Sequence, residues 1–237
     1  LAATTGVATG QTLTLAAAKA TGKTITGAGS GSVIVTALDQ TLNADVSNVT
    51  ADTGNSGSVT GTFLTSGTFE GNFGTAGMTV TISDGATMTV AANLVDGGTG
   101  PTLQKDGGGG TGIVAVRIGT ADAAVDMTSI SSSGAASTTF TVFQTISNFT
   151  GTLAATTSVA ASQTLTLTAA KATGKTITGA AGGNGNVVVS ALDQTLGAVL
   201  DNITADTGNG GSVTGTFLTS GEFTGSFGAA GMTVTIS

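Results

Sequence analysis

Residues 78–90 read Met-Thr-Val-Thr-Ile-Ser-Asp-Gly-Ala-Thr-Met-Thr-Val. Two short runs flank the Asp84-Gly85 pair, and in each run apolar side chains alternate with Thr. A period of two is typical of β-strands with one buried face, and Asp-Gly is a common turn dipeptide. The stretch therefore predicts two short strands joined by a tight turn.

The same pattern recurs along the chain. Comparable runs rich in Thr, Val and Ile occupy residues 12–15, 23–26 and 32–35, and further turns are predicted at the glycines of 97–98 and 107–110. The Ala-rich piece 15–20 is the only helix-like run, and it is too short to form a stable helix by itself. We therefore predict an all-β fold.

A long internal repeat organises the sequence. Residues 37–83 match residues 191–237 at 37 of 47 positions, and an earlier part of the two copies matches at an offset of 152 residues. We interpret residues 1–152 as a complete repeat unit and residues 153–237 as a partial second unit. Because both ends fall inside repeat-like sequence, we expect a segment of a longer array, with a two-domain protein as the alternative.

Composition favours one all-β architecture over another. The chain has 39 Gly and one Pro, and it has neither Trp nor Tyr. Immunoglobulin-like sandwiches usually carry a buried Trp and a corner Tyr, so tandem β-sandwich domains are the alternative. Short strands, tight turns and small aliphatic residues suit a β-solenoid, whose successive coils pair edge to edge. We predict a parallel β-helix-like rod built from repeats of about 150 residues.

The missing side chains and the net charge exclude several functions. Without His or Cys, the chain has no imidazole base, no thiol nucleophile and no disulfide. A net charge of −7 argues against nucleic acid and anionic membranes as partners. No apolar run is long enough to predict a membrane span. A chain without thiols also suits an extracellular location.

Two motifs resemble catalytic signatures. Residues 17–24 fit a loose phosphate-binding loop, but the glycines after Thr24 disfavour the helix that such a loop requires. The Asp-Thr-Gly triplets at Asp52 and Asp206 resemble those of aspartic proteases, and their duplication follows from the repeat. We interpret both motifs as turns, in which the Asp side chain bonds nearby amides.

Calcium is the metal that the sequence admits, because oxygen donors are the only ligands present in number. The side chains that recur in both copies are weak Ca²⁺ candidates: Asp39, Asp52, Asn55, Asp193, Asp206 and Asn209. The glycine-rich nonapeptides of calcium-binding β-rolls are absent. Turn capping by these side chains is therefore the default interpretation.

Phe is the one aromatic residue type in the chain, and six Phe residues recur with glycines between them: Phe63, Phe69, Phe73, Phe217, Phe223 and Phe227. We predict an aromatic stack inside wide coils; an exposed stripe that binds a sugar or another rod is the alternative. Thr-x-Thr elements such as Thr12/Thr14 and Thr79/Thr81 suggest an ice-binding function, but their spacing along the chain is uneven.

Two stretches carry a resemblance to a known class of proteins: residues 79–87 (Thr-Val-Thr-Ile-Ser-Asp-Gly-Ala-Thr) and residues 48–54 (Asn-Val-Thr-Ala-Asp-Thr-Gly). Together with the acidic, Cys-free and Pro-poor composition, they resemble bacterial surface-layer proteins and large repetitive adhesins of the β-solenoid type. The resemblance implies a secreted structural role, often with Ca²⁺ and ordered assembly.

We therefore expect a non-enzymatic segment of an extracellular surface layer, fibre or adhesin stalk. Its expected partners are copies of itself or adjacent repeats, with cell-surface polysaccharide as a further partner. The alternatives are a carbohydrate-binding adhesin tip, a polysaccharide-active enzyme and an ice-binding solenoid. The enzyme would need carboxylates grouped with Lys or Arg, and Arg117, Asp122 and Asp126 form the one such cluster in the sequence.

Overall fold

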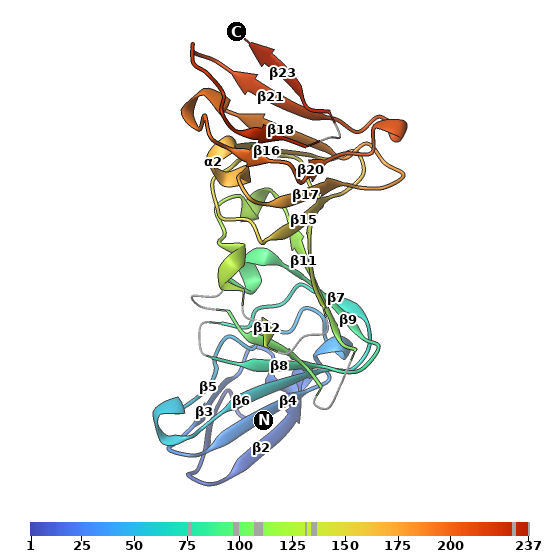
Figure 1. Ribbon diagram of the computed structural model, residues 1–237. Helices are drawn as coiled ribbons and strands as arrows, with labels where there is room; N and C mark the ends of the chain where they lie inside the picture. Colours follow the sequence, from blue (N-terminus) through green and yellow to red (C-terminus); the bar gives the residue numbers. More distant parts are fainter. Residues whose placement is uncertain are drawn as a thin grey trace. The chain divides into compact units, whose positions relative to one another are not determined.

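The computed structural model describes residues 1–74, 77–96, 100–106, 111–130, 132–133, 137–228 and 231–236 (Figure 1). The glycine turns predicted at 97–98 and 107–110 lie outside these residues. The described chain is mostly β, with a few short helices. It divides into two compact units, of which unit 1 comprises Leu1–Val116 and Ser129–Thr138 and unit 2 comprises Arg117–Thr128 and Thr139–Ser237.

Unit 1 is built from parallel strands. Six of them form a sheet in the order β12-β10-β8-β6-β4-β2, three form the sheet β1-β3-β5, and β7 pairs with β9. The strands are β1 Thr4–Val7, β2 Thr12–Ala16, β3 Thr24–Gly27, β4 Ser32–Thr36, β5 Val49–Ala51, β6 Val59–Phe63, β7 Gly67–Phe69, β8 Thr79–Ile82, β9 Thr87–Ala91, β10 Thr102–Lys105 and β12 Ser132–Ser133. The helices are α1 Ala17–Ala20 and the 3₁₀ helices η1 Leu38–Gln40, η2 Thr53–Asn55 and η3 Ala92–Leu94.

Unit 2 repeats this kind of pairing. Its five-stranded sheet has the order β14-β16-β18-β21-β23, β19 pairs with β22, and β15 pairs with β13 and β17, which in turn pairs with β20. The strands are β14 Ile146–Phe149, β15 Thr156–Val159, β16 Thr164–Thr168, β17 Thr176–Gly179, β18 Asn186–Ser190, β19 Val199–Leu200, β20 Ile203–Thr204, β21 Val213–Phe217, β22 Ser226–Phe227 and β23 Thr233–Ile236, while β11 Ile113–Ile118 and β13 Ser137–Val142 have residues in both units. The helices are α2 Ala169–Ala172, η4 Thr120–Asp122, η6 Leu192–Gln194 and η7 Thr207–Asn209, while η5 Met127–Ser129 has residues in both units.

The register shows that each strand pairs with a segment one coil further along the chain. Thr4 lies opposite Thr24, and Val33 lies opposite Val59, so the coils are of unequal length. Parallel neighbours cannot be joined by a hairpin, so the chain must travel round and return to the same edge each time. This pairing is consistent with a parallel β-solenoid-like fold, and it does not fit the β-sandwich alternative, whose sheets are antiparallel.

The core follows the alternation seen in the sequence. In β4, Val33 and Val35 are fully buried, while Ser32, Ile34 and Thr36 on the opposite face are half-buried. Along one inward row, Val35 neighbours Gly61, which neighbours Val80. A Cβ at Gly61 would lie 2.7 Å from Leu38 Cδ1, so the glycine makes room for the buried Leu38 side chain. The interior is therefore filled by small and medium aliphatic groups at close packing.

Three aromatic rings widen this core in unit 1. Phe63, Phe69 and Phe73 are each no more than 3% exposed, and the rings of Phe69 and Phe73 stack with centroids 4.2 Å apart. A Cβ at Gly71 would lie 2.6 Å from the Phe69 ring, so the intervening glycine is needed for the stack. The structure thus buries these three Phe residues, two of them as a stacked pair, and does not place them in an exposed stripe.

The β15 strand contains a buried hydroxyl with no hydrogen-bond partner among the described residues. Thr157 is 1% exposed and its Oγ1 is unpaired, whereas the matching Thr5 in β1 is half-buried. A buried polar group without a partner costs about 1–3 kcal/mol. The unpaired Thr157 hydroxyl therefore destabilises unit 2.

We expect Thr157→Val to raise the free energy of unfolding by about 1 kcal/mol, because the isosteric methyl removes the unpaired hydroxyl. Urea denaturation followed by circular dichroism measures the change. Thr5→Val is the matched control and should leave the unfolding midpoint nearly unchanged. A midpoint lowered by Thr157→Val would show that the hydroxyl has a partner in solution.

Candidate functional site

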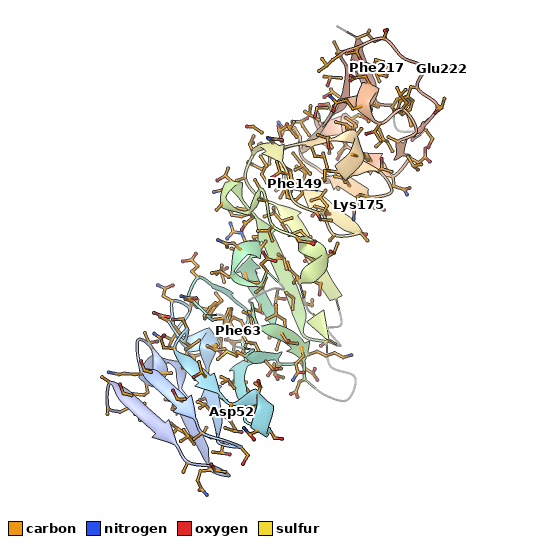
Figure 2. The ribbon with its side chains drawn as sticks, turned by 90° about the vertical axis from the view of Figure 1, so that its left-hand side faces the viewer. Asp52, Phe63, Phe149, Lys175, Phe217 and Glu222 are labelled. Carbon is orange, nitrogen blue, oxygen red and sulfur yellow. The ribbon has the colours of Figure 1, made fainter. Side chains whose placement is uncertain are left out.

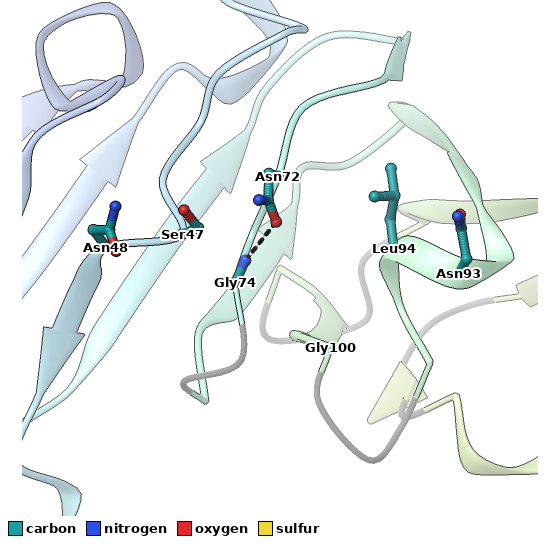
Figure 3. A pocket seen from close by; sticks show the side chains of 7 residues that line it. All are labelled: Ser47, Asn48, Asn72, Gly74, Asn93, Leu94 and Gly100. Carbon is teal, nitrogen blue, oxygen red and sulfur yellow. Dashed lines mark hydrogen bonds between the residues drawn. The ribbon is translucent and has the colours of Figure 1, made fainter.

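Unit 1 carries a polar pocket with a volume of about 400 Å³. Its walls come from the loop before β5, the segment after β7, and the η3 helix with a residue shortly before β10 (Figure 3). The lining residues are Ser47, Asn48, Asn72, Gly74, Asn93, Leu94 and Gly100. Three successive coils therefore each contribute an Asn side chain to one pocket.

Backbone pairing and short side-chain bonds hold the pocket walls. Asp45 and Asn72 are joined by a parallel β-bridge, and the Asp45 Oδ1 accepts hydrogen bonds from the Ser47 amide at 3.1 Å and its hydroxyl at 2.6 Å. The Asn72 Oδ1 accepts a bond from the Gly74 amide at 3.0 Å (Figure 3). These contacts fix the orientation of the Asn72 amide between Ser47 on one wall and Leu94 on the other.

The chemistry of this pocket is neutral. Amides and a hydroxyl supply donors and acceptors, Leu94 supplies an apolar surface, and none of the described lining residues ionises near pH 7. The Ser47 hydroxyl donates to Asp45. This lining fits an uncharged ligand with several hydroxyls, which would be held by hydrogen bonds to the amides.

Sequence reasoning did not identify this pocket. Asn72 and Asn93 carried no motif, and Asn48 lies in the segment that resembles surface-layer proteins. The signal was nevertheless present, since Asn48, Asn72 and Asn93 follow one another at intervals close to one coil. The exact length of each coil is needed to recognise that spacing, and it became known only with the strand register.

The structure uses Asp39, one of the Ca²⁺ candidates, to tie two coils together. Its Oδ1 accepts a hydrogen bond from the Leu64 backbone amide at 3.0 Å. Its Oδ2 accepts bonds from the Thr65 hydroxyl at 2.7 Å and from the Gln40 side-chain amide at 2.8 Å. Burial by itself raises the pKa of Asp39, but these hydrogen bonds outweigh it and hold the pKa below its ordinary value. Its carboxylate thus accepts hydrogen bonds from three protein donors.

Asp193 makes the same contacts in unit 2. Its Oδ1 accepts a bond from the Leu218 amide at 3.2 Å, and its Oδ2 accepts one from the Thr219 hydroxyl at 2.9 Å. The Leu218 amide is the main reason that the pKa of Asp193 lies below its usual range. The pair Asp39 and Asp193 therefore acts as a recurring carboxylate clamp, in which each Asp holds the next coil along the chain.

The remaining Ca²⁺ candidates bond within or between turns. The Asp52 Oδ2 accepts a hydrogen bond from Asn55 at 2.7 Å, and the Asp206 Oδ2 accepts one from Asn209 at 2.9 Å. Asp206 also accepts a bond from the Gly182 amide at 2.6 Å, which is the largest cause of its lowered pKa. Each Asp-Thr-Gly triplet thus forms an Asp-initiated turn with its own Asn.

Within the described ranges, no three acidic side chains group closely enough to hold a metal ion. The two triplet carboxylates each accept a hydrogen bond from a local Asn. The two stretches that resemble a phosphate-binding loop also lack the helix that such a loop requires, because Lys23 and Lys175 precede strands β3 and β17. The Lys175 Nζ instead donates to the Leu153 carbonyl at 2.7 Å.

The three charged residues that the enzyme alternative singled out each make a local contact. The Arg117 guanidinium lies over the Phe143 ring, 3.9 Å from its centroid. The Asp122 Oδ2 accepts a bond from the Gly119 amide at 2.7 Å, and the Asp126 Oδ1 accepts one from the Thr128 hydroxyl at 2.6 Å. Each of the three side chains thus has a neighbour of its own that accounts for its position.

The Thr-x-Thr elements fall on several sheets. Thr12/Thr14 and Thr79/Thr81 lie in the six-stranded sheet, whereas Thr24/Thr26 lie in β3 and Thr87/Thr89 in β9. One further element was overlooked in the sequence because Gly61 separates its two Thr residues. Thr60 lies opposite Thr79 and Thr62 opposite Thr81, so part of the uneven chain spacing disappears when the coils stack.

Comparison of the chain with protein-family models, with curated proteins and with solved structures gave no match. Within the described residues, no helix has the length and apolarity needed to cross a membrane.

The carboxylate clamp predicts an acid-sensitive fold. Because the pKa of Asp39 is lowered in the folded state, its stabilising effect is fully present above the unfolded pKa of about 3.9 and is lost as the pH falls from there through the lower pKa of the folded state. We expect the urea midpoint to drop as the pH falls below about 4. Asp39→Asn should cost about 2 kcal/mol at neutral pH and reduce this pH dependence.

Asp193→Asn is the matched control, since Asp193 makes the same two contacts with Leu218 and Thr219 in a more exposed setting. Its effect on the urea midpoint should be smaller. An unchanged urea midpoint, or an unchanged pH profile, in Asp39→Asn would show that the clamp does not stabilise the coil.

Proposed function

We propose that this chain is a non-enzymatic structural segment of an extracellular surface layer, fibre or adhesin stalk. It would be a stretch of β-solenoid in which units of about 150 residues follow one another and stack. Its partners would be adjacent repeats or other copies of the chain.

The continuous parallel pairing inside each unit is the observation that carries this proposal. Six strands pair side by side in one sheet of unit 1 and five in one sheet of unit 2. Each added coil extends such a sheet by about 4.8 Å and brings its own hydrogen bonds and core residues. An architecture of this kind gains length without needing a new fold, which is what a scaffold requires.

The chemistry of the described side chains supports a non-enzymatic role. The carboxylates of Asp39 and Asp193 clamp neighbouring coils, and Arg117 lies over the Phe143 ring. Catalytic sites usually hold titratable groups that are directed at a shared space and that have perturbed pKa values. Here the lowered pKa values have structural hydrogen bonds as their cause.

Electron microscopy of the native source, with gold-labelled antibody against this chain, tests the proposal. We expect label on a layer, filament or stalk outside the cell, with a regular repeat along it. Label that is confined to the cell interior, or to dispersed soluble particles, would contradict the scaffold function.

The amide-lined pocket favours a second candidate function, binding of neutral carbohydrate. Asn48, Asn72 and Asn93 present side-chain amides around about 400 Å³ of space, and sugar hydroxyls pair well with amides. A stalk that binds cell-surface polysaccharide along its side would combine both functions.

Glycan-array screening followed by calorimetry tests this second function. We expect binding of a neutral oligosaccharide, and the double variant Asn48→Ala, Asn93→Ala should weaken it about tenfold or more, because each lost hydrogen bond is worth about 1 kcal/mol. Asn43→Ala, an exposed Asn outside the pocket, is the matched control. If no neutral glycan bound in the screen, or if the double variant bound as well as the wild type, carbohydrate binding by this pocket would be ruled out.

A further inference from the structure

The two Asp-Thr-Gly turns have almost the same geometry but differ in the residue that follows the Asn. Unit 1 has Asn55-Ser56, and unit 2 has Asn209-Gly210. Both Asn side chains are exposed, and each donates its side-chain amide to the Asp that begins the turn, at 2.7 Å in unit 1 and 2.9 Å in unit 2. Figure 2 labels Asp52, which begins the turn of unit 1. The chain therefore contains a matched pair of turns in which one side chain is changed.

The backbone after Asn209 is free to rearrange at low cost. Gly210 is exposed and has a left-handed φ of 81°. Its amide donates to the Thr207 carbonyl at 3.3 Å, which is long for a hydrogen bond between backbone groups. Among the described residues outside the turn, a Cβ at Gly210 would meet the Asn184 Cβ alone, at 3.8 Å. The Gly210 nitrogen can therefore approach the Asn209 side chain after a local opening of the turn.

The same approach is hindered in unit 1. The Ser56 amide also donates at 3.3 Å to the turn, in this case to the Thr53 carbonyl, so the hydrogen bond does not distinguish the two turns. Ser56 has a φ of 66°, a conformation in which a side chain is already strained. Its Cβ lies next to the nitrogen that would have to reach the Asn55 Cγ. The side chain of Ser56 is thus the feature that protects Asn55.

The chain has one other Asn-Gly pair, Asn184-Gly185, and that pair is held more tightly. The Asn184 side-chain oxygen accepts a bond from the Ser162 hydroxyl at 2.9 Å, and its carbonyl accepts one from the Asn186 side chain at 3.0 Å. Gly185 is buried, and a Cβ there would lie 2.5 Å from the Val159 carbonyl oxygen. A rearrangement at Asn184 would therefore have to break its packing against the preceding coil.

Asp206 connects the Asn209 turn to the preceding coil. Its Oδ2 accepts hydrogen bonds from the Asn209 side chain and from the Gly182 amide, the latter at 2.6 Å. An aspartate at position 209 has no amide hydrogen to donate, and its negative charge lies beside the Asp206 carboxylate. Loss of the Asn209 amide therefore weakens the contact between Asp206 and Gly182.

We propose that Asn209 is a site of spontaneous deamidation, and that its conversion loosens the contact of this turn with the preceding coil. The Gly210 nitrogen loses its proton and forms a bond to the Asn209 Cγ, and the side-chain nitrogen leaves as ammonia. The succinimide ring that results then takes up one molecule of water. Cleavage of the new N–Cγ bond gives aspartate, and cleavage of the original peptide bond gives isoaspartate. No atom is oxidised or reduced in either step.

Peptide mass spectrometry of the full chain tests the site. The chain is incubated at mildly alkaline pH in water that carries a heavy oxygen isotope, and it is then denatured and cleaved before Asp. This cleavage places the Asn55 turn in residues 52–83, the Asn209 turn in residues 206–237 and Asn184 in residues 126–192. We expect the mass increase and the oxygen label to accumulate first in residues 206–237.

Two reciprocal variants exchange the residue after each Asn. Gly210→Ser gives the unit 2 turn the residue of unit 1 and should abolish labelling at Asn209 over the same incubation. Ser56→Gly should create labelling at Asn55. Both positions have a left-handed φ, so each turn already accepts the residue that the other carries. The second variant tests the proposal even if the first does not fold.

Three results would overturn the deamidation site: residues 206–237 without label, residues 52–83 labelled as fast as residues 206–237, or a folded Gly210→Ser chain labelled as fast as the wild type. Hydrogen exchange tests the loosened contact, since the Gly182 amide should exchange faster in the converted chain. An unchanged exchange rate at Gly182 would show that the contact between the coils survives conversion.

Discussion

Hydrogen bonding between parallel backbones of successive coils is the constraint on which the other features depend. Each coil must return to the same edge of the sheet, because its backbone amides would otherwise lose their hydrogen-bond partners. Thr4 thus pairs with Thr24, and Val33 pairs with Val59. The turns, the glycines and the narrow aliphatic core all follow from that requirement. Even the position of the carboxylate clamp follows from it, since Asp39 can reach Leu64 only because one coil separates them.

Nearest-neighbour pairing also determines which residues can cooperate. The polar pocket draws Asn48, Asn72 and Asn93 from three coils, and the aromatic stack joins Phe69 to Phe73 inside one. A cluster of side chains from several coils is compact in space, but its members are separated along the sequence by about the length of one coil. In a fold of this kind a binding surface is built by repetition of a position, and its strength grows with the number of coils that carry the same residue type.

Strand content was predictable from the sequence, because alternation of Thr with Val, Leu or Ile is a strong local signal, as in residues 78–90. The sequence also indicated that glycines relieve crowding around Phe69 and Phe73. The pairing partners were harder to predict, because the coils differ in length and the register is a long-range property. Ala37 and Ala191 illustrate the limit: both adopt a left-handed backbone, with φ of 55° and 54°, where Gly would be expected. The Ala37 amide donates to Thr62 on the next coil, a contact that no local pattern reveals.

The buried hydroxyl of Thr157 shows that a repeated residue need not have a repeated environment. Thr5 and Thr157 occupy matching positions in nearly the same local sequence, but Thr5 is half-buried and Thr157 is 1% exposed. The cost of a hydroxyl at this position therefore depends on the coil that packs against it and not on the strand that carries it.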